Sequence, residues 1–133
     1  MKETKIEIED YYVILNLHKA LLEAKFHTNP DNINVCFSPI IADFCNELVD
    51  TLAIIDEERD NKNVGKWDDW RMLKNQSFYR DRALKNAILY DRWIKMNNEQ
   101  KATMTKNLLS PFKATDEEIE SFIKDVDEAI DSI

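Results

Sequence analysis

Two pairs of acidic residues are the first candidates for chemistry in this chain. Glu47 and Asp50 stand three residues apart, and Glu57 and Asp60 repeat that spacing ten residues later. Side chains at i and i+3 share one face of a helix, so each pair could bind Mg²⁺ together with bound water. A chain with 26 acidic residues also produces such pairs by chance. We therefore interpret them first as a solvated helix face, and keep a Mg²⁺ site as the alternative.

These pairs are similar to the acidic helices of all-α nucleotide pyrophosphatases, which hold Mg²⁺ with ExxE and ExxD units. The likeness covers the eight positions 47–50 and 57–60. It implies a Mg²⁺-dependent nucleotide hydrolase with Glu47, Asp50, Glu57 and Asp60 as the metal ligands. Such an enzyme needs a second acidic helix facing the same cavity, and the sequence identifies none.

The histidines and cysteines offer no further metal site or nucleophile. His18, His27, Cys36 and Cys45 follow one another at intervals of nine. Nine residues turn a helix through about 900°, so two histidines on one helix face opposite sides. Zinc ligands usually come in pairs two to five residues apart. We expect a packed core histidine at residue 18, a helix C-terminus at residue 27, two reduced cysteines and no cofactor.

The single glycine, Gly65, excludes several enzyme classes. Phosphate-binding loops need more than one glycine because the backbone must approach the phosphate closely, and the GxSxG nucleophile elbow needs two. All-β folds also depend on frequent glycine and proline turns, and this chain has only three prolines. The sequence therefore favours a non-enzymatic helical protein.

Hydrophobic periodicity predicts the helices that position these residues. The expected helices cover about residues 8–27, 38–60, 67–75, 78–96, 99–109 and 116–133, with a loop at 28–37. Ser38 before Pro39, Ser77, and Thr115 with Glu118 are the expected N-terminal caps. We predict one domain, 1–133, folded as a compact all-α bundle of four to six helices without significant β-sheet.

The net charge of −8 hides a segregation along the chain. Residues 1–60 hold 5 basic and 13 acidic side chains, residues 61–113 hold 12 and 5, and residues 114–133 hold 1 and 8. Two interpretations stay open. The acidic helices could pair with the basic middle inside the molecule, or they could face outward and meet a basic partner.

A partner-binding surface is predicted where the acidic stripe meets two tryptophans. Its residues are Asp43, Glu47, Asp50, Glu57, Trp67 and Trp70. Tryptophan is common at interface hot spots because it buries a large area with little loss of entropy, although it is also a common core residue.

Nucleic-acid binding by the basic middle is the less favoured alternative. Arg82, Lys85 and Arg92 share one flank of the predicted helix 78–96. An overall charge of −8 opposes approach to a polyanion.

The leading hypothesis is a small acidic protein that binds another protein carrying a basic surface. Small acidic helical proteins of this size often serve as inhibitors, immunity proteins or antitoxins of bacteria, phages and mobile elements. We expect a cytoplasmic protein, because the first ten residues are charged and no apolar run is long enough for a membrane span. The oligomeric state and the identity of the partner stay open.

Overall fold

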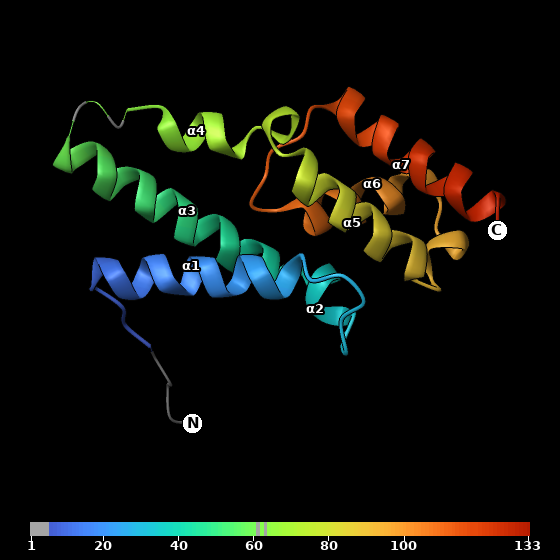
Figure 1. Cartoon of the computed structure of the whole chain (residues 1–133), viewed down its shortest axis with the longest axis horizontal. Coiled ribbons are helices and arrows are strands. Elements are labelled where there is room, and N and C mark those ends of the chain that lie inside the picture. Colours follow the sequence, from blue (N-terminus) through green and yellow to red (C-terminus); the bar gives the residue numbers. More distant parts are fainter. Residues whose placement is uncertain (1–5, 61, 63) are drawn as a thin grey trace.

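The computed structural model describes residues 6–60, 62 and 64–133, and the elements in that part of the chain are helical (Figure 1). None of these residues belongs to a β-strand, and Met72 and Lys113 form an isolated bridge. The all-α prediction is confirmed. In chain order the elements are α1 (Tyr11–Lys25), α2 (Asn34–Phe37), α3 (Pro39–Arg59), α4 (Lys66–Arg71), η2 (Leu73–Asn75), α5 (Ser77–Leu89), η3 (Trp93–Lys95), α6 (Asn98–Leu109) and α7 (Asp116–Asp131).

Helices α1 and α3 lie against each other and run in opposite directions (Figure 1). The Asp10 side chain caps α1 by accepting from two backbone N–H groups, and Ser38 caps α3 immediately before Pro39. The Tyr11 hydroxyl donates to Asp56 Oδ1 at 2.9 Å, which joins the start of α1 to the end of α3. Local capping therefore fixes where both helices begin, and packing fixes how they pair.

Helix α7 packs against α5 and α6 in the other half of the molecule (Figure 1). Complete capping boxes start α6 at Asn97 with Gln100, and α7 at Thr115 with Glu118. Each box satisfies two backbone groups that a helix N-terminus otherwise leaves unpaired. The cap predicted at Thr115 is confirmed.

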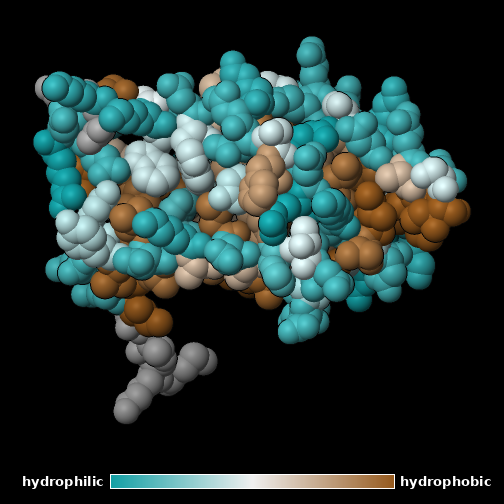
Figure 2. Space-filling view, in the orientation of Figure 1, coloured by the Kyte–Doolittle hydropathy of each residue, from teal (hydrophilic) through white to brown (hydrophobic). Residues whose placement is uncertain are grey.

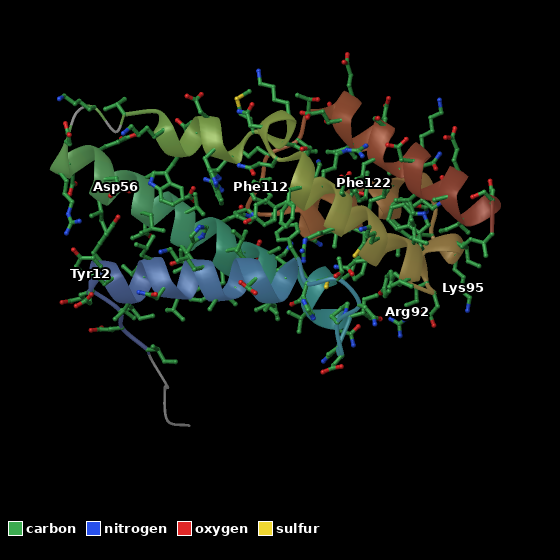
Figure 3. The ribbon with its side chains drawn as sticks, viewed as in Figure 1. Tyr12, Asp56, Arg92, Lys95, Phe112 and Phe122 are labelled. Carbon is green, nitrogen blue, oxygen red and sulfur yellow. The ribbon has the colours of Figure 1, made fainter. Side chains whose placement is uncertain are left out.

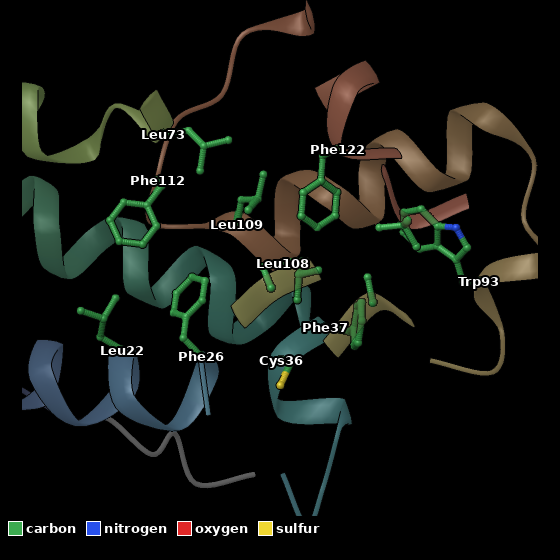
Figure 4. Packing of buried hydrophobic residues seen from close by; sticks show 13 residues of the cluster. Leu22, Phe26, Cys36, Phe37, Leu73, Trp93, Leu108, Leu109, Phe112 and Phe122 are labelled. Atoms are coloured by element: carbon green, nitrogen blue, oxygen red, sulfur yellow. The ribbon is translucent and has the colours of Figure 1, made fainter. Parts of the chain in front are cut away.

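The buried side chains form two clusters. The larger one gathers residues of α1, α2, α5, α6 and α7 around Phe26, Leu108 and Phe122 (Figure 4). The smaller one lies between α1 and α3 and contains Ile14 and Leu52, with half-buried apolar residues packed around it. Helix α1 contributes to both clusters from one face, while Tyr12 and Val13 on its other face are exposed.

One buried lysine pairs with no carboxylate among the described residues. Lys25, at the end of α1, is 0% exposed, and its Nζ donates to the carbonyl oxygens of Asn107 and Leu108 at 2.6 Å each. Those carbonyls belong to the last turn of α6, which has no further helical N–H groups to bind. Lys25 thus caps the C-terminus of α6 from another helix.

Burial lowers the pKa of Lys25 from its usual 10.5 to about 7. The hydrogen-bond count agrees with this direction. A neutral amine carries two N–H donors, and two carbonyls accept from it. The protonated amine carries a third N–H, and the hydrogen bonds of Lys25 include no third acceptor for it.

The predicted helix 78–96 is wrong in its C-terminal third. Helix α5 ends at Leu89, Tyr90 is extended, and residues 93–95 form a separate 3₁₀ turn. This break lets Trp93 enter the core with 0% exposure. Its Nε1 donates to Asp127 Oδ1 at 2.8 Å. Its neighbour Ile94 is 67% exposed.

Three smaller predictions also need correction. Residues 34–37 lie in the predicted loop but form α2, which buries Cys36 and Phe37. The predicted segment 67–75 is divided into α4 and η2, because Met72 is extended. Ser77 is the first helical residue and makes no cap hydrogen bond, and Gln76 occupies the cap position.

Candidate functional site

The predicted acidic stripe on α3 is interrupted by an internal ion pair. Arg71, on α4, is 4% exposed, and its Nη1 donates to Asp50 Oδ1. The other guanidinium donors reach Asn46 Oδ1 at 2.9 Å and Pro111 O at 3.0 Å. Asp50 therefore balances a buried charge within the molecule. Its side chain remains 62% exposed, so the partner-binding role predicted for it stays a prediction.

The stripe as a whole stays at the surface, Asp50 included. Asp43 and Glu47 are exposed, Glu57 is half-buried, and Asp60 is exposed at the end of α3. Within the described residues, no group of three or more His, Cys, Asp or Glu side chains could hold a metal ion. The Mg²⁺ alternative at Glu47, Asp50, Glu57 and Asp60 therefore has no converging ligand set, and one of its four ligands is already paired with Arg71.

The basic middle of the chain pairs in part with the acidic helices. Besides Arg71, Arg80 Nη2 lies 2.7 Å from Asp125 Oδ2, and Lys101 Nζ lies 3.0 Å from Asp127 Oδ1. Each of the two interpretations left open by the sequence therefore describes part of the molecule. Some carboxylates hold α5 and α6 onto α7, and others remain exposed.

The predicted nucleic-acid face is not assembled on one helix. Arg82 lies on α5, where its Nη1 donates to Phe26 O at 3.3 Å and its guanidinium stacks 4.5 Å from the Phe78 ring centre. Lys85 is exposed on α5. Arg92 follows the end of that helix and points away from the bundle (Figure 3). The shared flank that the sequence predicted does not exist, because α5 stops before Arg92.

A groove of about 680 Å³ runs between α6 and α7. Its carboxylates, from both helices, are Glu99, Asp116, Glu120, Asp127, Glu128 and Asp131. Its two basic residues are Lys106 and Lys124, and Ala102, Ile119 and Ile123 contribute apolar surface. Asp127 is engaged by Lys101 and Trp93. The groove thus combines an apolar strip with an excess of negative charge.

The α7 side of this groove follows from the helical period. The lining positions 116, 119, 120, 123, 124, 127, 128 and 131 recur at alternating steps of three and one. This stripe spans about 22 Å at 1.5 Å per residue. The sequence showed the acidity of residues 114–133 and the amphipathic pattern of the last helix. It gave no sign of which neighbour would form the opposite wall.

A second hollow, of about 340 Å³, lies between α1 and α4. Its walls are Leu15, His18, Trp67 and Trp70, and Lys19 and Lys66 complete the lining. The indoles of Trp67 and Trp70 each meet the imidazole edge to face, with ring centres 5.4 and 5.2 Å from that of His18. We call this hollow the aromatic pocket.

Both tryptophans of the aromatic pocket are fixed by internal contacts. Trp67 Nε1 donates to Asp56 Oδ2 at 2.7 Å, and Asp56 lies on α3, toward α4 (Figure 3). Trp70 packs against Phe112 with ring centres 4.9 Å apart. Trp67 and Trp70 are half-buried. Both rings therefore take part in internal packing and also present part of their area to the surface. This is intermediate between the core role and the interface role that the sequence suggested.

His18 is held neutral in this pocket. It is 6% exposed, and burial, with a smaller contribution from Lys19, lowers its pKa from 6.5 to about 4. The prediction of a packed core histidine is confirmed. Sequence reasoning missed that His18 lines a pocket, because Trp67 and Trp70 lie about fifty residues away along the chain.

Most of the surface seen in Figure 2 is hydrophilic, and apolar residues gather near the C-terminal end. No helix among the described residues is both long enough and apolar enough to cross a bilayer. Neither a protein-family model, nor a curated protein, nor a solved structure matches the chain. A function for this chain must therefore be argued from the surfaces described above.

Proposed function

We propose that this chain acts by binding a basic segment of another protein in the groove between α6 and α7. The single observation that carries the proposal is the composition of that groove, which joins six carboxylates and two lysines to an apolar strip. Interfaces that combine a desolvated apolar centre with a charged rim are typical of specific protein recognition. Charge alone would give weak and unselective binding. The apolar strip also fixes the position of the partner segment along the groove.

The shape of the groove favours an extended helical ligand. The lining of α7 is continuous over its whole length, from Asp116 to Asp131. A partner helix that places apolar residues at i, i+3, i+4 and i+7 would lay them over Ala102 and Ile123. Lysines and arginines on its flanks would then face the carboxylates of both walls.

Electrostatics would act mainly on the rate of association. The overall charge of −8 attracts a basic partner at a distance, and complementary fields raise association rates. A chain that covers a basic surface in this way would inhibit whatever that surface binds. This is the mechanism of inhibitor, immunity or antitoxin proteins, and we place the present chain in that class as part of the proposal.

A synthetic peptide tests the groove directly. The probe is a fluorescent helical peptide with leucines on one stripe and lysines on both flanks. A scrambled peptide of the same composition lacks the stripe. We expect the striped peptide to bind at least about tenfold more tightly than the scrambled one, because only it can use the apolar strip. Fluorescence anisotropy at two salt concentrations measures both affinities.

Two charge-reversed variants locate the site. Glu120→Lys with Asp131→Lys changes two exposed residues of the groove, and Glu58→Lys with Glu117→Lys changes two exposed residues outside it. Both variants alter the net charge by the same amount. We expect the groove variant to lose about tenfold or more in affinity and the control to lose much less. Equal losses would show unselective attraction and would contradict the proposal.

A further inference from the structure

The aromatic pocket has a composition that sets it apart from the rest of the surface. Three rings, from His18, Trp67 and Trp70, and the side chain of Leu15 form its walls. Two cationic residues, Lys19 and Lys66, are exposed in its lining. No carboxylate from the described residues belongs to this lining. On a protein of net charge −8, this lining gathers two cations beside three aromatic rings.

His18 supplies the second observation. Its side chain is more than nine-tenths buried, lines the pocket, and makes no hydrogen bond with any residue in the described part of the chain. The neutral imidazole offers one N–H donor and one nitrogen acceptor. Among the described side chains the fully enclosed polar atom without a partner is Asn86 Oδ1, so the ring nitrogens of His18 are not sealed from the pocket, and water or a ligand can pair with them there.

The tryptophans are preorganised for stacking. Trp67 is held by Asp56, and Trp70 is held by Phe112 and by the side of Trp67, at 5.3 Å between ring centres. Neither ring has to be ordered when a ligand arrives, so little conformational entropy is lost on binding. A planar aromatic ring can stack on or pack edge-on to these walls.

We propose that the aromatic pocket binds a small planar aromatic molecule that carries an anionic group. The ring packs against Trp67 and Trp70, a polar edge of the ring exchanges a hydrogen bond with His18, and the anion lies between Lys19 and Lys66. The volume of about 340 Å³ is at the lower end for ligand pockets, which limits the occupant to a single small ring system. A carboxylate and a phosphate monoester share this chemistry.

The three tryptophans make this proposal testable by nuclear magnetic resonance. Each indole N–H gives one signal, and Trp93 serves as an internal reference because it is 0% exposed and bound to Asp127. The probes are indole-3-acetate and adenosine 5′-monophosphate, with 3-methylindole and adenosine as their neutral counterparts. We expect at least one anionic probe to shift the Trp67 and Trp70 signals and leave Trp93 in place. If indole-3-acetate is the probe that responds, the anionic group is a carboxylate, and if adenosine 5′-monophosphate responds, it is a phosphate.

Variants separate the roles of the walls and the lysines. Lys19→Gln with Lys66→Gln should weaken the responding anion at least about fivefold and leave its neutral counterpart unchanged. Lys74→Gln with Lys85→Gln removes two exposed lysines outside the pocket and should change neither. His18→Phe keeps an aromatic ring and removes both nitrogens, so it should weaken both members of a pair. If that variant does not fold, the lysine variants still test whether the pocket binds the anionic group.

Several results would overturn the proposal. One is the absence of any Trp67 or Trp70 shift with all four probes at about 10 mM, a concentration that detects very weak binding. A second is a Trp93 shift as large as the others. A third is equal affinity for the anionic and neutral members of each pair. The peptide experiments on the α6–α7 groove do not depend on these outcomes, because none of the groove residues lines the aromatic pocket.

Discussion

At the scale of single residues, two buried basic side chains are the least expected features. Lys25 and His18 are both almost fully buried, and neither has a carboxylate partner among the described residues. Burial favours the neutral form of each, and their lowered pKa values follow from it. Lys25 uses its donors to close the end of α6, whereas His18 presents its ring to a pocket.

Replacing Lys25 by Met should destabilise the protein. The methionine fills similar space but leaves the carbonyls of Asn107 and Leu108 without their donor. An unpaired buried polar group costs about 1–3 kcal/mol, so we expect a loss of about 2–5 kcal/mol in the free energy of unfolding. Urea denaturation measures it. A loss below 1 kcal/mol would show that these hydrogen bonds contribute little.

That loss should depend on pH. The Lys25 pKa is about 7 in the folded state and 10.5 in the unfolded state. Below pH 7 both states are charged and the folded state bears the full cost of burial. Between pH 7 and 10.5 only the unfolded state binds the proton, so the stability of the wild type rises. Lys25→Met should therefore be more destabilising at pH 9.5 than at pH 6, and an equal effect would contradict the lowered pKa.

The lowered pKa of His18 predicts a loss of stability in a different pH range. Its pKa falls from 6.5 in the unfolded state to about 4 in the folded state, so acidification from pH 6.5 to 4 should remove stability. His18→Phe lacks this proton and should lose less stability over the same range. Subtracting the two curves, measured by urea denaturation, isolates the contribution of His18. Parallel curves would show that His18 keeps its usual pKa.

At the scale of elements, one face of α3 carries two kinds of acidic residue. Asp50 holds Arg71 of α4, while Asp43 and Glu47 face solvent and form no ion pair with a basic residue in the part of the chain that the structure describes. Spacing on the helix does not distinguish them, because the difference depends on where α4 lies. Reversal of all three to Lys, as a test of the predicted stripe, would therefore mix a structural effect with an interface effect.

Single substitutions separate the two effects. Asp50→Ala should cost about 1–3 kcal/mol, because Arg71 stays buried and loses its anionic partner, although part of the Asp50 side chain remains in solvent. Glu47→Ala should change stability by less than about 0.5 kcal/mol. Thermal or urea denaturation of both variants decides. Equal and small effects would show that the Arg71–Asp50 pair is not structural.

At the scale of the whole molecule, two hydrophobic clusters share α1. Phe26 and Leu22 at its end belong to the larger cluster, and Ile14 nearer its start belongs to the smaller one. Arg71 adds a polar link, since it joins α3 to the Pro111 carbonyl beyond α6. These connections favour cooperative folding of both halves.

Leu52→Ala tests this cooperativity. Leu52 is 0% exposed in the smaller cluster, and its truncation should cost about 2–5 kcal/mol. Trp67 lies beside that cluster and Trp93 lies in the larger one. If the chain folds as one unit, both tryptophans report the same lowered midpoint. Two separate transitions, with only the Trp67 signal shifted, would show two independently folding halves.

The sequence by itself determined the helical class, the starts of α3 and α7 and the acidity of both ends, because periodicity, capping and charge are local properties. It did not determine the end of α5, the pairing of Asp50 with Arg71, the burial of Lys25 or the walls of either hollow. Each of those depends on side chains that lie far apart in the sequence and meet only when the helices pack. Tertiary structure decided them for two reasons. Burial of Trp93 outweighs the helix propensity of Tyr90, and a buried polar group pairs with a donor or acceptor that helix packing brings within hydrogen-bonding distance.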